Sequence, residues 1–341
     1  MTSVKEFEIH TPARPDGPGL GAFRFTDRYS IFDWGEMPDR LESKGAVLCT
    51  MGAYTFERLE AAEIPTHYRG IGDPTAPEPL AAASSPPRRM VIELTQTPPL
   101  PHVDGDFDYA AYHAAGGAHH LVPLEVVFRN AIPPTSSVRG RLPPTVAGLD
   151  DEEWPSETVW LETPLVEFST KFEPQDRYLD REEAAAVAGP AGIDELEALA
   201  HAVNAEVTAI AAEGGFEHLD GKIECLYAAG EVQVADVAGT FDENRFRYDG
   251  LAVSKEVLRM YYRAHAPEWY SAVTAAKRTA GPEWRTAVEV TPPPLPKELK
   301  MAVEQLYQAG ADSYTGRGHF DAGELSAAVA RVGAIVGGQN S

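Results

Sequence analysis

Residues 214–249 read GGFEHLDGKIECLYAAGEVQVADVAGTFDENRFRYD and predict two strands joined by a short turn, followed by a charged loop. Side chains alternate with period two over 222–227 and again over 231–236, which is the pattern of half-buried strands. The intervening Ala-Ala-Gly at 228–230 suits a hairpin turn. We therefore expect a β-hairpin at the centre of the fold.

One face of this hairpin concentrates charge. Asp220, Lys222 and Glu224 lie two residues apart on the first strand, so they share a face, and Asp236 ends the second strand close to it. Lysine offers a point charge to phosphate, and carboxylates offer the hard oxygen ligands that Mg²⁺ prefers. The face is thus suited to a triphosphate and its magnesium, or it is simply the solvated face of a surface hairpin.

A second stretch, HLVPLEVVFRN at 120–130, predicts a hydrophobic strand that ends in Arg129. Its Val-Pro-x-Glu-x-x-x-Arg run and the Asp-x-Lys-x-Glu run at 220–224 together resemble the two sequence signatures of SAICAR synthetases (phosphoribosylaminoimidazole-succinocarboxamide synthases), enzymes of purine biosynthesis. The resemblance extends in order over about residues 20–262, through Phe25-Thr26-Asp27-x-x-Ser30-x-x-Asp33, Lys44-Gly45, Ile64-Pro65-Thr66-His67, Lys171 with Asp176, and Thr240-x-Asp242-x-x-Arg245.

The resemblance implies an activity, a fold and two cofactors. The family joins L-aspartate to the carboxylate of an aminoimidazole carboxylate ribotide and converts ATP to ADP and phosphate, with Mg²⁺. A carboxylate is a poor acyl donor until it is phosphorylated, so such a site needs cations for phosphate and acids for the metal. The implied fold is α+β and two-lobed, like ATP-grasp enzymes or kinases, with ATP between the lobes.

The same resemblance assigns roles to residues. Lys222 would contact the ATP phosphates, and Glu224 and Asp236 would serve the nucleotide or, with Asp176, the magnesium ion. The predicted catalytic residues are Lys222, Asp176 and Asp33, and the predicted substrate-binding residues are Arg129, Ser137, Arg245, Ser30 and Lys44. Arginine suits the ribotide 5′-phosphate because its planar fork donates two hydrogen bonds. A structural salt bridge with Glu125 or another acid is the alternative role for Arg129.

The chain also departs from the family pattern. The Gly-Lys-x-Lys run that usually lines the ATP site near the N-terminus is absent, and the loop GPGLG at 17–21 is not a Walker loop because no Lys-Ser/Thr follows it. Gln175 and Arg177 stand where the family has the histidine and proline of a His-Asp-Pro run.

Composition limits the choice of partners. The formal net charge of −23 argues against nucleic acid, whose binding needs clustered Lys and Arg. No apolar run approaches the roughly 20 residues of a membrane span, so we expect a soluble, cytoplasmic protein whose partners are small molecules, with a homo-oligomer possible. Cys49 and Cys225 lie in apolar patterns and predict buried thiols without a disulfide.

The remaining patterns divide the chain into three parts. A strand-rich lobe is expected at 1–118, a larger α+β lobe at 119–290, and a helical extension at 291–341. Apolar stripes predict helices near 44–63, 181–188, 194–212, 254–265, 298–308 and 322–336, and strands within 5–34 and at 90–95, 121–130 and 165–172. The segments 70–89, 98–120 and 133–154 are expected to be irregular connections.

Two other functions fit the same residues. A relative recruited to specialised metabolism could join another heterocyclic carboxylate to an amino acid. A non-catalytic nucleotide-binding protein could keep the scaffold alone, although the joint presence of Lys222, Glu224, Asp236 and Arg245 speaks against it.

Overall fold

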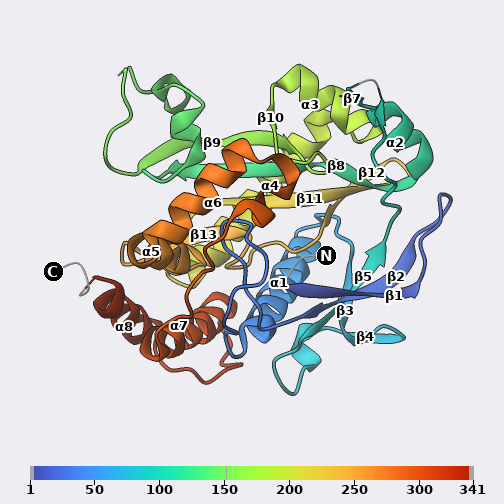
Figure 1. Cartoon of the computed structure of the whole chain (residues 1–341). Helices are drawn as coiled ribbons and strands as arrows, with labels where there is room; N and C mark the ends of the chain where they lie inside the picture. Colours follow the sequence, from blue (N-terminus) through green and yellow to red (C-terminus); the bar gives the residue numbers. More distant parts are fainter. Residues whose placement is uncertain (1–3, 104, 151, 338–341) are drawn as a thin grey trace.

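The computed structural model describes residues 4–103, 105–150 and 152–337. It contains two antiparallel sheets, and each is built from strands of one continuous part of the sequence (Figure 1). The first has strand order β1-β2-β5-β3-β4, and the second has the order β10-β9-β8-β11-β13-β14 with β12 paired to β11. All strands of the first sheet precede residue 95, and those of the second follow residue 118. This division agrees with the proposed lobe boundary near 118, which stays a prediction.

The strands of the first sheet are β1 (Lys5–Thr11), β2 (Gly19–Phe25), β3 (Tyr68–Asp73), β4 (Ala76–Glu78) and β5 (Arg89–Leu94). Those of the second are β8 (His119–Ile132), β9 (Val159–Thr170), β10 (Tyr178–Leu179), β11 (Glu217–Ala228), β12 (Glu231–Ala235), β13 (Asn244–Tyr248) and β14 (Leu251–Ala252). A small hairpin, β6 (His102–Val103) and β7 (Asp106–Phe107), lies between the two sheets in sequence.

The helices are α1 (Lys44–Ala61), α2 (Tyr109–Gly116), α3 (Arg181–Ala188), α4 (Ile193–Glu213), α5 (Glu256–His265), α6 (Pro267–Thr279), α7 (Lys297–Thr315) and α8 (Leu325–Gly337). Short 3-10 turns include η1 (Leu80–Ala82), η2 (Ser137–Gly140) and η5 (Gly281–Ala287). The α+β fold prediction is therefore confirmed, as are the hairpin at 214–249 and the helices near 44–63, 181–188, 194–212 and 254–265.

Strands β8 and β11 form the centre of the second sheet. Their antiparallel register pairs Arg129 with Asp220, Lys222 with Val127, and Glu224 with Glu125. Because side chains alternate across a strand, this register brings the charged residues of both strands to one face. The opposite face is apolar, and α4 packs against it with a stripe that includes Leu196, Val203, Val207 and Ile210.

Three parts of the sequence fold differently from the prediction. Segment 70–89 is not irregular throughout, because Asp73 Oδ1 accepts a hydrogen bond of 2.8 Å from the Thr75 amide and closes the β3–β4 turn. Segment 98–120 contains α2, whose first turn is capped by Asp108. Helix α6 was also missed, and Pro267 at its first turn is the signal that marks it.

The loop 26–43 contains no strand, so the strands expected within residues 5–34 are confined to β1 and β2. Phe32 and Asp33 have φ angles of 52° and 55°, which no strand allows. Helix α7 is longer than the predicted 298–308, whereas α8 is slightly shorter than the predicted 322–336. Helix α7 packs against α1 and α4 rather than standing apart. Cys49 and Cys225 are buried and free, as predicted.

Integration of α7 into the core gives a prediction for stability. Leu306 on α7 is 1% exposed, so Leu306→Ala should lower the free energy of unfolding by about 2–5 kcal/mol, the range for buried Leu→Ala. Met301 on the same helix is 47% exposed, and Met301→Ala should change it by less than about 0.5 kcal/mol. Urea denaturation of both variants measures this, and equal small effects would show that α7 is only an appendage.

Candidate active site

A cavity of about 420 Å³ lies between the two sheets and receives side chains from both. Strand β1 and the loop 26–43 line it from one side, and β8, β11 and α5 line it from the other. The predicted residues Ser30, Asp33, Lys222, Glu224 and Asp236 all line this cavity. The structure thus brings together five residues that lie as much as 206 positions apart in sequence, between 30 and 236.

Lys222 lies among carboxylates on the charged face of the second sheet. Its Nζ donates to Glu125 Oε1 at 2.8 Å and lies 3.6 Å from Glu243 Oε2. Burial alone would lower the pKa of Lys222, but Glu243, Glu125 and Glu224 outweigh burial and hold that pKa well above its ordinary value. Lys222 therefore stays charged, as a phosphate ligand must.

Glu224 and Asp236 are two neighbouring acids in the wall of the cavity. Lys171 forms an ion pair with Glu224, and Lys5 forms one with Asp236. Burial and the Asp236 charge raise the pKa of Glu224 despite Lys171. Burial also opposes ionisation of Asp236, but Lys5 and Lys171 keep its pKa below the ordinary value.

The backbone at Asp236 is held in an unusual conformation. Its φ angle is 60°, in the left-handed region that costs energy for residues other than glycine. His67 supports this conformation, because its Nε2 donates to the Asp236 carbonyl oxygen at 3.0 Å. Asp236 directly follows β12, and its strained backbone turns the chain away from the strand direction. The Asp236 side chain lines the cavity at this turn.

Sequence reasoning missed Lys5. This residue brings a lysine from the first sheet into the cavity, although the Gly-Lys-x-Lys run of the family is absent. Its ammonium reaches the cavity from β1 and lies 4.4 Å from the centre of the Phe23 ring. A single lysine in a strand carries no motif, so only its alternation with Glu6 on β1 could have pointed to it. Lys171, Lys255, Arg259 and Arg285 were likewise not assigned to the site.

A second cavity of about 250 Å³ joins the first, and Arg129, Ser137 and Arg245 line it, as predicted for one binding site. Ser137 begins η2, directly after Ser136. The two cavities share wall residues, so a ligand in one can meet a ligand in the other. The shared residues are Glu125, Lys222, Asp242, Glu243, Lys255 and Arg259.

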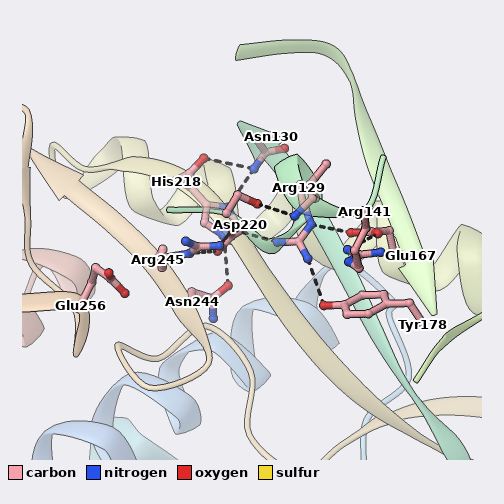
Figure 2. Close-up of polar contacts among 12 residues, drawn as sticks. Arg129, Asn130, Arg141, Glu167, Tyr178, His218, Asp220, Asn244, Arg245 and Glu256 are labelled. Atoms are coloured by element: carbon pink, nitrogen blue, oxygen red, sulfur yellow. Dashed lines mark hydrogen bonds and ion pairs between the residues drawn. The ribbon is translucent and has the colours of Figure 1, made fainter. Parts of the chain in front are cut away.

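Three arginines and two acids form one connected cluster at the wall of the second cavity (Figure 2). Arg129 Nε donates to Glu167 at 2.6 Å and Nη1 to Asp220 at 3.3 Å, whereas Arg245 Nε donates to Asp220 at 2.8 Å. Arg141 also donates to Glu167, at 2.6 Å. Three guanidinium groups therefore share two carboxylates, which leaves one positive charge for an anion.

Arg129 is itself buried, at 3% exposure. Burial would lower its pKa, but Asp220 and Glu167 outweigh burial and raise it. The alternative role of Arg129 in a structural salt bridge is thus real, with Glu167 and Asp220 as partners rather than Glu125. Arg245 is more accessible, and its Asp220 partner is shared, so it is the better candidate to change partners when an anion enters.

Two predicted residues lie outside both cavity walls. Lys44 is 1% exposed, and its Nζ donates to Asp242 at 2.7 Å, so it holds Asp242 from behind. Asp176 lies in the segment between β9 and β10 with its side chain exposed, and partial loss of solvation together with Glu125 and Asp33 raises its pKa. The charges of the cavity residues Glu125 and Asp33 therefore act on Asp176, although Asp176 does not line the cavity.

The three predicted magnesium ligands are not gathered around one point. Across residues 4–103, 105–150 and 152–337, no group of three His, Cys, Asp or Glu side chains has the arrangement of a metal site. Glu224 and Asp236 adjoin each other, but Lys171 and Lys5 neutralise them, and Asp176 lies with Glu125 and Asp33 instead. Two carboxylates still fit Mg²⁺, which takes its other ligands from water and phosphate.

Comparison with known proteins agrees with this geometry. The family model described as SAICAR synthetase matches residues 15–276. This chain belongs to the SAICAR synthetase family. A protein of Archaeoglobus fulgidus that carries the provisional name phosphoribosylaminoimidazole-succinocarboxamide synthase is 40% identical over 97% of this chain and 98% of its own. A phosphoribosylaminoimidazole-succinocarboxamide synthase of Thermoplasma acidophilum is 27% identical over 89% of this chain and 95% of its own.

Solved structures of the family share the fold. SAICAR synthase from Saccharomyces cerevisiae, complexed with SAICAR, has a TM-score of 0.61 over 93% of each chain at 18% identity. A SAICAR synthetase in complex with ADP has a TM-score of 0.53 and covers 76% of this chain and 88% of its own at 22% identity. The predicted fold and the ligase of purine biosynthesis are confirmed, and nothing supports the alternative in specialised metabolism.

Two buried histidines beside the site predict a pH dependence of stability. Burial lowers the pKa of His67 and His218 to about 4, against about 6.5 in an unfolded chain. Between these values the unfolded chain binds more protons, so stability falls as the pH falls. We expect a loss of about 2 kcal/mol per histidine between pH 7 and pH 5, because 1.4 kcal/mol corresponds to one pKa unit.

Thermal denaturation at the two pH values checks this expectation. His218→Gln should remove about half of the pH-dependent loss, whereas His10→Gln, at an exposed position of β1, should leave it unchanged. A melting temperature that is equal at pH 7 and pH 5 would contradict the assignment of both histidines as buried and neutral.

Proposed function

We propose that the two joined cavities hold ATP and the ribotide of 5-amino-1-(5-phospho-D-ribosyl)imidazole-4-carboxylate, to which the chain joins L-aspartate. One observation carries this proposal: the cavity with spare arginine charge adjoins the cavity with lysines and paired acids. A monophosphate and a magnesium triphosphate need these two environments. ADP, phosphate and the succinocarboxamide ribotide are the products.

Arg245, Arg129 and Ser137 bind the ribotide 5′-phosphate. The excess guanidinium charge around Asp220 and Glu167 supports this role, because a phosphate can take bidentate donation from Arg245 without breaking the Arg129–Glu167 pair. The azole ring then extends toward Lys222 and Asp242, the residues that both cavities share. Ser30 lies on the opposite wall, where it can contact the substrate.

Lys222, Lys5 and Lys171 bind the ATP phosphates, while Glu224 and Asp236 hold magnesium. Lys171 and Lys5 pair with Glu224 and Asp236, the two acids that would hold the ion, whereas Lys222 pairs with Glu125. The ion would therefore replace Lys171 and Lys5 at these acids and leave both lysines for the phosphates. The ion would neutralise negative charge on the phosphate oxygens. Lys44 supports this site indirectly by fixing Asp242.

The reaction proceeds in two displacement steps at the junction of the cavities. The ribotide carboxylate attacks the γ-phosphorus, ADP leaves, and the acyl phosphate forms next to Lys222. The aspartate amine then attacks the acyl carbon, and phosphate leaves with the carboxylate oxygen. Asp176, whose pKa is raised by burial, Glu125 and Asp33, accepts the proton that the amine loses. Asp33 orients the amine.

The partners are therefore small molecules, and the cytoplasm supplies all of them. Within the described residues, no helix has the length and apolar character needed to cross a membrane. The acidic surface implied by the net charge of −23 suits solubility and not nucleic-acid binding.

A coupled assay of ADP release tests the activity. ADP should form in the presence of Mg²⁺ only when the carboxylate ribotide and L-aspartate are both present, because only then can the acyl phosphate be consumed. Each substrate is omitted in turn as the control. Equal ADP release without aspartate would identify an ATPase or a kinase and would contradict the ligase proposal.

Arg245→Ala tests the division between the cavities. The variant should raise the KM for the ribotide and lower kcat/KM by about ten- to a hundredfold, the loss expected for one charge-assisted contact, with little change in the KM for ATP. Arg247→Ala is the matched control, since Arg247 lies on the same strand but donates to Thr158 and lines neither cavity. A rise in the KM for ATP instead would reverse the assignment of the two cavities.

A further inference from the structure

Two histidines lie ring to ring outside both cavities. His113 on α2 and His120 on β8 are in direct contact, with 2.9 Å between His113 Nδ1 and His120 Nε2. The outer nitrogen of each ring faces a backbone carbonyl oxygen. His113 Nε2 lies 2.9 Å from the Val187 oxygen, and His120 Nδ1 lies 3.1 Å from the Gly117 oxygen. The two rings and the two carbonyl groups thus form a chain of three contacts.

The surrounding backbone holds both rings in place. His120 is fully buried, and His113 is half-buried. Two glycines make room for the rings. A Cβ atom at Gly189 would lie 2.5 Å from His113 Nε2, and a Cβ atom at Gly116 would lie 2.8 Å from His120 Cγ. The chain therefore leaves space for this arrangement of the two rings at positions where any other residue would displace them.

The three contacts of the histidine pair require three protons. A carbonyl oxygen only accepts hydrogen bonds, so the outer nitrogen of each ring must donate. A neutral imidazole carries one proton, and two neutral rings would use both of theirs in this way. The inner nitrogens would then face each other at 2.9 Å with lone pairs alone. A third proton between the inner nitrogens converts this repulsion into a hydrogen bond and gives the pair one positive charge.

Burial opposes such a charge, whereas two helix ends favour it. Burial lowers the pKa of both rings, and the charges of His113 and His119 lower that of His120 further. Val187, however, lies in the last turn of α3, and Gly117 directly follows α2. The C-terminal end of a helix carries partial negative charge and stabilises a cation. Hydrogen bonds from a charged donor are also roughly twice as strong as those from a neutral one.

The other titratable groups that face the pair are two tyrosines and one histidine. Tyr112 on α2 packs edge-on against both rings, and its hydroxyl donates to the Leu121 carbonyl oxygen at 2.7 Å. The Tyr227 ring on β11 lies 5.4 Å from the His120 ring. His119 is the neighbour on β8. Among the described residues, no carboxylate acts on the pKa of either ring. The third proton therefore depends on the two carbonyl groups and the helix ends.

The pair adjoins the place where the two sheets are joined. Gln96, which follows β5 of the first sheet, donates to the His119 oxygen of β8 and accepts from the Leu121 amide, both at 2.9 Å. The Ala118 amide donates to the Pro15 oxygen between β1 and β2 at 3.1 Å. We call these contacts of residues 15, 96 and 118–121 the junction. The histidine pair holds the junction from the side of α2 and α3.

We propose that His113 and His120 share a third proton at neutral pH and that this proton stabilises the junction between the two sheets. When the pH rises and the shared proton is lost, the inner nitrogens repel each other and the junction loosens. The main cavity lies between the same two sheets. Loss of the proton therefore sets an upper limit to the pH range in which the cavity keeps its shape.

Thermal denaturation of His120→Asn gives the first test. The asparagine amide can still donate to the Gly117 oxygen, but no proton can be shared. In the unfolded chain imidazole has its ordinary pKa of about 6.5. The contribution of the shared proton is therefore complete below about pH 6.5 and is lost as the pH rises through the higher pKa of the folded pair. The melting temperature of the wild type should exceed that of His120→Asn by more at about pH 6 than at about pH 9.

A pair that holds only two protons predicts the opposite trend, because a histidine whose pKa is lowered by folding destabilises the folded chain at low pH. The difference between the wild type and His120→Asn would then grow from about pH 5 to about pH 7 and stay constant above, which would overturn the proposal. His113→Gln, whose amide can donate to the Val187 oxygen, should follow the trend of His120→Asn. His10→Gln, at an exposed position of β1, is the matched control and should show no trend.

Two measurements on the wild-type chain do not depend on the folding of a variant. NMR of the imidazole nitrogens at neutral pH should show three protons on the four nitrogens of the pair, and a count of two would overturn the proposal. Hydrogen exchange, corrected for the intrinsic rate, reports on the junction. Protection of the Ala118 and Leu121 amides should fall between about pH 6 and about pH 9, while that of the α4 amides stays constant. Constant protection of the junction amides would contradict its dependence on the shared proton.

Discussion

The antiparallel pairing of β8 with β11 is the constraint on which the site depends. Its register sets Glu125 directly opposite Glu224, and like charges in such a pair repel. The pairing persists because Lys222 and Lys171 lie between these acids and neutralise them. The same ladder sets Arg129 opposite Asp220 a few residues away. One register therefore produces both the acid–lysine cavity and the arginine cavity.

In this arrangement the lysines and the acids of the site neutralise one another. Lys5, Lys171 and Lys222, the lysines proposed to bind phosphate, each have a carboxylate partner, and Glu224 and Asp236, the acids proposed to bind a metal, each have a lysine partner. A buried charge left without a partner costs several kcal/mol, so a cation or an anion entering alone would be disfavoured. A metal–triphosphate ligand would supply both charges together, so the proposed binding of the ion would be coupled to that of the nucleotide.

The sequence allowed part of this site to be predicted for a clear physical reason. Residues on strands with period-two alternation, such as Lys222 and Glu224, can be placed on a common face without any knowledge of the rest of the fold. Contacts between distant segments cannot be obtained in this way. Lys5 meets Asp236 across 231 residues, and Lys44 meets Asp242 across 198.

Lys44 illustrates the limit of motif reasoning. It matches the family pattern, yet its ammonium lies behind Asp242 and not in the cavity. Helix α2 was missed for a different reason, since a short Ala-rich helix has a weak apolar stripe and is recognised mainly by Asp108 at its cap. Helix α6 is marked by Pro267 at its first turn.

The extension beyond the family region contributes to the environment of the site rather than only to its outer surface. The Tyr307 ring on α7 lies 6.0 Å from Lys44 Nζ, so this helix closes the back of the Lys44–Asp242 pair. Exclusion of water strengthens that pair, because the same charges attract more strongly in a medium of low dielectric constant. Asp242 borders both cavities, so the ligands proposed for the two cavities would both lie beside it. Helix α7 thus supports the position of Asp242 from outside the region that matches the family.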